Sequence, residues 1–227
     1  MSEINYRVAL VSASPKVEQE WAVSAFLAKY AASHLISESL AIDTIPVRHV
    51  LMHHETTPAF EIIQNADAIV LIFPLYFFCM PAMLTRFLQD FAVSKPKSNK
   101  ACTVYALVNC GFPEPEINLE AMRVVEQFAL QTGRVFGGGV MIGCGGMIIG
   151  AQGAPFMREV MEQVDALFAR VDLGLSQSDS IEPKIVATAP KFPRALYFLV
   201  GNAGWRSTAR KNHLKNNDLY KAPYRSK

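Results

Sequence analysis

A run of six apolar residues, Ala68 to Phe73, constrains the fold of this chain more than any other segment. The run follows Asp67, is too short to span a bilayer, and shows no alternation of polar and apolar residues. Such a run is typical of a strand that is buried on both faces, as in the middle of a parallel sheet. Pro74 has no amide hydrogen to donate to a central ladder and therefore predicts the end of the strand.

Further apolar runs and helical patterns along the chain predict that this strand is part of a doubly wound α/β domain. The expected strands are residues 7–11, 42–47, 68–73, 101–108 and 134–142, and the expected helices are residues 18–35, 59–64, 83–91, 114–132 and 156–173. Strands and helices alternate throughout, which predicts a five-stranded parallel sheet. The flavodoxin-like strand order 2-1-3-4-5 places strands 1 and 3 where the order reverses, and open α/β sheets bind ligands there, beyond the carboxyl ends of the strands.

Composition divides the chain into a large domain, residues 1–175, and a linker with a basic extension, residues 176–227. The net charge of +2 favours neither nucleic acid nor a membrane as the partner of the whole chain, but residues 206–227 hold seven Lys and Arg and one acid. A basic tail can bind anionic lipid or nucleic acid. Apolar anchors within it favour docking on the domain or on a partner subunit; they are Trp205, Leu214, Leu219 and Tyr224.

The sequence predicts a cytoplasmic protein. Its first residues lead into a strand without the basic-then-apolar pattern of a signal peptide, and no apolar run reaches the about 18 residues that span a bilayer. The four cysteines form no C-x-x-C pair, so we expect free thiols in a reducing compartment.

The loop after the first strand, residues 12–16, has the features of a phosphate site. Amides at the N-terminus of the next helix, the helix dipole and serine hydroxyls attract an anion, Lys16 adds positive charge, and Ser24 is a further hydroxyl. The alternative is a solvated turn in which the serines cap the helix. Glu18 and Glu20 follow closely and count against an anion.

The loop after the third strand, residues 74–81, is aromatic and bracketed by prolines, which suits a flat, stacking ligand. Tyr76 and Phe77 are the expected contacts, because a strand exit presents its first residues to the crevice. The alternative is that Phe77, Phe78 and Met80 pack under the next helix or at a dimer contact.

The loop after the fourth strand, residues 109–112, offers backbone groups and the Asn109 amide to the same crevice, or is an ordinary glycine turn. Cys110 has no histidine nearby in the sequence and no feature that lowers a thiol pKa, so we expect no nucleophile there.

Two further patterns are a pair of spaced histidines and a cluster of glycines. His49 and His53 are spaced i, i+4, which suits a metal only on a helix; the segment is predicted to be a polar loop, and we expect no metal site. Residues 137–153 hold eight of the thirteen glycines, which indicates a backbone that approaches a ligand or a partner closely.

Three segments resemble the NAD(P)H-dependent FMN reductases and multimeric flavodoxins of the flavodoxin-like superfamily. Residues 8–16 are similar to their opening strand and Gly-Ser-Pro-Arg loop, with Ala13 and Lys16 in place of the usual Gly and Arg. Residues 67–91 resemble their A-D-x-I-V segment, which continues through P-x-Y to L-K-x-F-x-D. The tail from Lys191 is similar to that of some bacterial flavodoxin-family proteins.

The resemblance implies FMN as the cofactor and NAD(P)H as the electron donor. The residues that it assigns to the FMN phosphate are Ser12, Ser14, Lys16 and Ser24. Those that it places around the isoalloxazine are Pro74, Leu75, Tyr76 and Phe77, with Asn109, Cys110 and Gly111 on the next loop.

The implied activity is transfer of a hydride from the nicotinamide via flavin N5 to a small acceptor such as a quinone, in a homodimer and without a catalytic side chain. The cysteine cluster of the iron–sulfur relatives is absent from the sequence. Two alternatives stay open. One is a single-electron carrier of the flavodoxin type, which the net charge of +2 disfavours because such carriers are usually acidic. The other is a non-catalytic binding protein that has lost FMN.

Overall fold

The computed structural model describes residues 6–16, 21–35, 39–94, 101–176 and 182–222. The chain forms two compact units, an α/β unit of residues 1–190 and a helical unit of residues 191–227.

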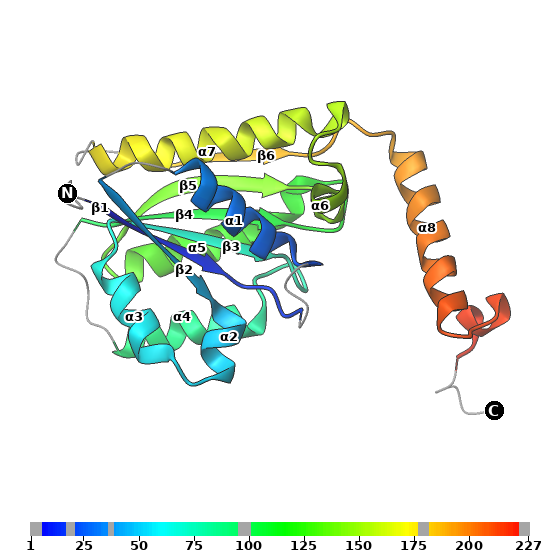
Figure 1. Ribbon diagram of the computed structural model, residues 1–227, viewed down its shortest axis with the longest axis horizontal. Helices are drawn as coiled ribbons and strands as arrows, with labels where there is room; N and C mark the ends of the chain where they lie inside the picture. Colours follow the sequence, from blue (N-terminus) through cyan, green and yellow to red (C-terminus); the bar gives the residue numbers. More distant parts are fainter. Residues whose placement is uncertain (1–5, 17–20, 36–38, 95–100, 177–181, 223–227) are drawn as a thin grey trace. The chain divides into compact units, whose positions relative to one another are not determined.

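A parallel sheet of six strands forms the centre of the α/β unit, in the order β2-β1-β3-β4-β5-β6 (Figure 1). The strands are β1 (Tyr6–Ser12), β2 (Leu40–Pro46), β3 (Ala68–Pro74), β4 (Thr103–Asn109), β5 (Val135–Ile142) and β6 (Lys184–Thr188). The predicted order 2-1-3-4-5 is confirmed, with all neighbours parallel. The predicted number of five strands is wrong, because β6 adds a sixth beyond β5.

The sixth strand comes from a segment that the sequence analysis assigned to the extension. It pairs Lys184 with Gly138 and Thr188 with Ile142. Gly138 has a φ of +89°, and a Cβ on it would lie 2.2 Å from the Lys184 carbonyl oxygen. A Cβ on Gly139 would lie 2.1 Å from the Ala106 carbonyl oxygen of β4. The close approach that these two glycines permit is therefore between neighbouring strands.

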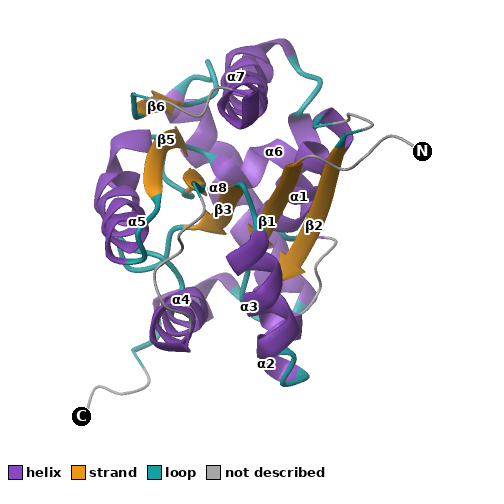
Figure 2. Ribbon diagram, turned by 90° about the vertical axis from the view of Figure 1, so that its left-hand side faces the viewer, coloured by secondary structure: helices purple, strands orange, loops and turns teal. Residues whose placement is uncertain are grey.

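Helices cover both faces of the sheet (Figure 2). One face carries α1 (Val23–His34), α6 (Ile148–Ala151) and α7 (Arg158–Ser176). The other carries α2 (Val47–Met52), α3 (Thr56–Asn65), α4 (Ala82–Ser94) and α5 (Leu119–Gln131). Short 3₁₀ turns are η2 (Pro115–Asn118), η3 (Gly145–Met147) and η4 (Pro155–Met157). No helix within the described ranges has both the length and the apolar character needed to cross a bilayer.

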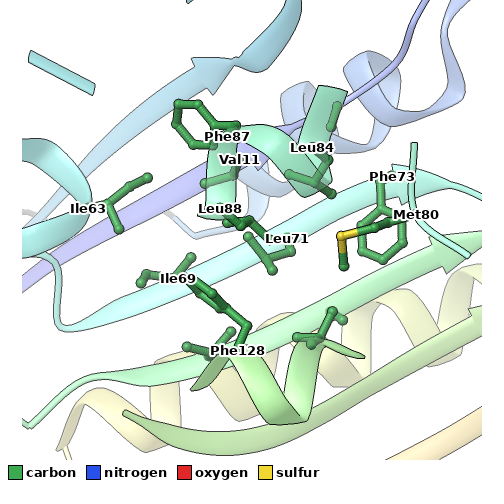
Figure 3. Packing of buried hydrophobic residues seen from close by; sticks show 14 of the residues in the cluster. Val11, Ile63, Ile69, Leu71, Phe73, Met80, Leu84, Phe87, Leu88 and Phe128 are labelled. Carbon is green, nitrogen blue, oxygen red and sulfur yellow. The ribbon is translucent and has the colours of Figure 1, made fainter. Parts of the chain in front are cut away.

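The central strand β3 is buried on both faces, as its apolar run predicts. Ile69, Leu71 and Phe73 face the layer of α4 and α5, and the intervening side chains face α1 and α7. Figure 3 shows the first set packed with Leu84 and Phe128. Complete burial of an apolar side chain of this size stabilises the fold by about 1.5–3 kcal/mol, so β3 anchors both layers.

The helical unit contains α8 (Arg194–Lys211) and η5 (Asn216–Tyr220). The sequence analysis did not predict α8. His213, with a φ of +60°, follows the end of this helix, and the Leu214 amide donates to the Ala209 carbonyl at 2.9 Å.

Candidate functional site

The three loops predicted to bind a ligand follow adjacent strands and lie at one edge of the sheet. The Ala13 amide, just beyond β1, donates to the Ile72 carbonyl of β3 at 3.0 Å. The Leu75 amide, just beyond β3, donates to the Asn109 carbonyl of β4 at 2.7 Å. The ends of β1, β3 and β4 are therefore joined by backbone hydrogen bonds, at the point where the order of the sheet reverses.

Two buried hydroxyls of the first loop and helix have no hydrogen-bond partner in the described structure. Ser12, the last residue of β1, is 4% exposed, and Ser24, in the first turn of α1, is 1% exposed. A buried polar atom without a partner costs about 1–3 kcal/mol, so each such atom calls for an explanation. A ligand that accepts a hydrogen bond from such a hydroxyl would supply the missing partner.

The N-terminus of α1 is a second feature of this part of the site. Its N-cap residue is Ala22, and no described side chain caps the helix. The first amides of a helix have no partner within it, and together with the helix dipole they favour an anion. The alternative interpretation, in which serine side chains cap this helix, therefore has no support from the described residues, and the phosphate site stays a prediction.

Ser14 and Lys16 shape the loop itself. The Ser14 hydroxyl accepts a hydrogen bond from the Lys16 amide at 3.2 Å, and the Lys16 ammonium donates to the Trp21 carbonyl at 2.7 Å. The positive charge is thus held at the loop by its own backbone. Glu18 and Glu20, which count against an anion in the sequence analysis, lie outside the described residues.

The aromatic loop forms a tight turn in a conformation that its residues disfavour. Tyr76 and Cys79 exchange two backbone hydrogen bonds of 2.8 and 3.0 Å, as in a two-residue hairpin. The central residues Phe77 and Phe78 have φ values of +47° and +62°. Type I′ turns need positive φ at both positions and normally use Asn and Gly. Phe77 is also 98% exposed and Phe78 is 61% exposed.

In the loop after β4, the Asn109 side chain connects two strands and is not exposed to a ligand. Asn109 is buried, and its side-chain amide donates to the Phe73 carbonyl of β3 at 3.3 Å. A Cβ on Gly145 would lie 2.6 Å from the Asn109 side-chain oxygen, so the loop after β5 approaches the same side chain. Gly111, by contrast, lies at the surface, and a Cβ there would meet nothing within 4 Å.

Cys110 is buried beneath this loop. Its sulfur accepts a hydrogen bond from the Asn118 side-chain amide at 3.4 Å and lies 3.5 Å from the Phe112 carbonyl. Burial raises the pKa of the Cys110 thiol above its usual value, because desolvation outweighs these hydrogen bonds. The thiol is neutral near pH 7, so it lacks the thiolate that a nucleophilic cysteine needs.

Two features of this edge were missed by the sequence analysis. Phe78 shares the strained turn with Phe77, although it was weighed only as a packing residue. The loop after β5 also joins the site, because the Cys144 and Gly145 amides donate to the Phe112 and Cys110 carbonyls, both at 2.7 Å. The glycine cluster was the available signal for this loop.

Only the first part of the histidine segment is helical, since α2 ends at Met52, before His53 and His54. The predicted loop is therefore wrong for residues 49–52. His49 lies in α2, and its ring centroid is 4.2 Å from that of His53. The His49 ring is also 3.5 Å from the Glu55 carboxylate. Within the part of the chain that the structure describes, no three His, Cys, Asp or Glu side chains come together as a metal site.

Several of the solved structures that match the fold of this chain are oxidoreductases. An NADH:FMN oxidoreductase in its apo form matches with a TM-score of 0.57 and 20% identity, over 78% of this chain and 93% of that one. An NAD(P)H:quinone oxidoreductase from Methanothermobacter marburgensis matches with a TM-score of 0.55 and 14% identity, over 78% and 100%. An FMN-dependent NADH-azoreductase from Bacillus anthracis in complex with FMN matches with a TM-score of 0.51 and 14% identity, over 73% and 99%.

No protein-family model and no curated protein sequence matches the chain. At such identities the structural likeness shows the fold, and activity has to be argued from the site. The resemblance seen in the sequence is therefore confirmed at the level of the fold: the chain has the flavodoxin-like fold of the NAD(P)H-dependent FMN reductases.

Proposed function

We propose that this protein is an FMN-dependent NAD(P)H oxidoreductase that reduces a small acceptor such as a quinone. The observation that carries the proposal is the pair of unpartnered, buried hydroxyls of Ser12 and Ser24 beside the uncapped N-terminus of α1. Together they provide hydrogen-bond donors for a phosphate group where a flavodoxin-like sheet binds its ligand. The likeness to an azoreductase in complex with FMN supports the choice of FMN as that ligand.

Each loop has a separate role in this proposal. Ser12, Ser24 and the first amides of α1 hold the phosphate, Ser14 keeps the loop in shape, and Lys16 contributes positive charge. Residues 74–77 flank the isoalloxazine. The backbone of residues 109–111 lines the neighbouring wall, which the buried Asn109 side chain fastens to β3.

The bound flavin supplies the hydride chemistry, so the protein needs no acid, base or nucleophile of its own. The neutral Cys110 thiol is consistent with a protein that contributes no catalytic side chain, because it offers neither charge nor a reactive sulfur. We further propose a homo-oligomeric, cytoplasmic enzyme. A single-electron carrier is less well supported, because the net charge of +2 is unlike that of the acidic flavodoxins.

The test is to load the protein with FMN and to follow oxidation of NADH and NADPH with a quinone as the acceptor. We expect turnover with at least one nucleotide. Substitution of both Ser12 and Ser24 by alanine should weaken FMN binding by about 100-fold or more, since each of the two hydrogen bonds to a charged group contributes about 1.5–3 kcal/mol.

Thr188→Val is a matched control, because Thr188 carries another buried hydroxyl without a partner, at the end of β6. It should leave FMN affinity unchanged. Retention of FMN without any oxidation of NADH or NADPH would refute the oxidoreductase and favour an electron carrier or a binding protein.

A further inference from the structure

The exposed aromatic side chains of the described α/β unit are confined to the candidate site. They lie in the connections that follow β1, β3 and β4, and they are Trp21, Tyr76, Phe77, Phe78 and Phe112. The other described Phe, Tyr and Trp side chains of this unit are buried or half-buried. Exposed apolar side chains that gather in one place mark a surface that binds a partner or a ligand.

Two of these rings have no part in the proposed flavin site. Tyr76 and Phe77 are assigned to the isoalloxazine, and Trp21 adjoins the phosphate loop. Phe78 is 61% exposed and Phe112 is 52% exposed, so neither ring packs in the core. An exposed ring lacks the stabilisation that burial provides, so both rings would gain from covering an apolar ligand.

The backbone presents Phe78 and Phe112 on neighbouring loops. The Leu75 amide donates to the Asn109 carbonyl at 2.7 Å, which joins the loop after β3 to the loop after β4. Phe78 and Phe112 each lie three residues beyond this hydrogen bond. Phe78 also has a φ of +62°, and strain of this kind is typical of functional sites. A ligand that contacts both rings has to extend across both loops, which favours fused rings over a single ring.

The charge of these loops indicates which ring systems fit. Residues 74–81 and 109–113 include no charged side chain. The second loop continues into Glu114 and Glu116, and these carboxylates add to the effect of burial in raising the pKa of Cys110, so negative charge lies close by. An anionic ligand would lose hydration without gaining an ion pair from these loops, and the carboxylates would repel it. An uncharged ring system meets neither cost.

We propose that Phe78 and Phe112 bind the electron acceptor, and that this acceptor is an uncharged, flat system of fused rings such as a naphthoquinone. This assignment rests on the proposed oxidoreductase function. In the overall reaction NAD(P)H gives up a hydride and becomes NAD(P)⁺, solvent supplies a proton, and the quinone gains two electrons and two protons to become a hydroquinone. The two phenylalanines contribute no chemistry to this step; they hold the acceptor by stacking.

The test compares Phe78→Leu and Phe112→Leu with the wild type, all loaded with FMN. The acceptors are menadione, which is an uncharged naphthoquinone, a naphthoquinone sulfonate, which adds a negative charge to the same rings, and ferricyanide, which has no ring to stack. Each substitution should raise the KM for menadione, relative to that for ferricyanide, by about two- to tenfold, the range expected for the loss of one aromatic contact. Phe78→Tyr and Phe112→Tyr are the matched controls, because they keep a ring and should keep the wild-type KM.

A calorimetric titration of the FMN-loaded protein without NAD(P)H measures binding of the acceptor apart from turnover. We expect each leucine variant to show the same two- to tenfold rise in the Kd for menadione, and we expect the wild type to bind menadione more tightly than the sulfonate. An unchanged Kd for menadione in either leucine variant would overturn the assignment, and so would equal or tighter binding of the sulfonate.

Two other results would also overturn it. A raised KM for NADH or NADPH alone would assign the rings to the nucleotide, and a changed mass of a leucine variant in light scattering would assign them to a contact between chains. An enzyme that reduces ferricyanide but fails these tests keeps the proposed function. Failure to oxidise NADH or NADPH with any acceptor refutes that function and the assignment with it.

Discussion

Replacement of Phe77 by glycine should stabilise the fold while weakening the proposed cofactor site. Phe77 holds a φ of +47°, and for a residue other than glycine the left-handed region costs about 1–2 kcal/mol. Its side chain is 98% exposed, so its removal sacrifices almost no burial. Glycine also lowers the stability by about 0.4–1 kcal/mol, because it increases the conformational freedom of the unfolded chain. The net gain is about 1 kcal/mol, which raises the melting temperature by roughly 2–4 °C in a domain of this size.

The same substitution removes an aromatic surface that we propose to contact the isoalloxazine. An aromatic contact of this kind contributes about 0.5–1.5 kcal/mol, so the Kd for FMN should rise by roughly two- to tenfold. Thermal unfolding without flavin measures the first effect, and a fluorescence titration with FMN measures the second. The two effects have opposite signs, which separates a binding role from a structural one.

His54→Gly is the matched control for this experiment. His54 has a φ of +58° and lies in the turn between α2 and α3, outside the proposed site. Its substitution should raise the melting temperature and leave FMN affinity unchanged. A lower melting temperature for Phe77→Gly would show that the turn is not strained. An unchanged Kd for FMN would show that Phe77 does not contact the cofactor.

Two further predictions concern the stability of the sheet. Burial raises the pKa of Tyr105 from 10.0 to about 12, so stability should fall as the pH rises from 10 toward 12, because the unfolded chain loses this proton first. Between pH 10 and 12 the free energy of unfolding of Tyr105→Phe, measured with a chemical denaturant, should fall less than that of the wild type, by up to about 2 kcal/mol. An equal fall in the two proteins would show that Tyr105 does not cause the pH dependence. Gly139→Ala should cost about 3 kcal/mol in urea unfolding, because its Cβ would lie 2.1 Å from the Ala106 carbonyl oxygen, and a cost near zero would show that β4 and β5 can separate.

Local patterns predicted the parts of the fold that depend on burial. The apolar run that became β3 and the helix expected at residues 114–132 both pack in the core, because a sheet covered on both faces needs apolar residues on each side. The strand β6 has only five residues, begins with Lys184 and is largely exposed at the edge. Its pairing depends on Gly138, which lies far away in the sequence, so no local pattern indicated it.

Helices α2 and α8 were not predicted from the sequence, for different reasons. The six-residue α2 presents only Val47 and Val50 to the core, and the polar residues Arg48 and His49 between them obscure the pattern. In α8 apolar residues lie on opposite sides of the helix, so no single stripe stands out from the sequence.

Sequence reasoning predicted which loops form the candidate site but not their geometry. The strand-exit loops were identified because they follow buried strands at the reversal point of the sheet. The two hydroxyls without partners are separated by twelve residues, and only the fold shows that both are buried. The left-handed turn at Phe77 and Phe78 goes against the preference of both residues, so no propensity could predict it.

The central claim, that the edge formed by β1, β3 and β4 binds FMN for reduction by NAD(P)H, is tested most directly by a visible absorption spectrum. The protein is mixed with FMN, excess flavin is removed, and NADH or NADPH is added without oxygen. We predict the bands of an oxidised flavin at one FMN per chain, bleached by at least one of the two nucleotides. A colourless protein that retains no FMN would contradict the account and would favour a binding protein that uses the same fold without a flavin.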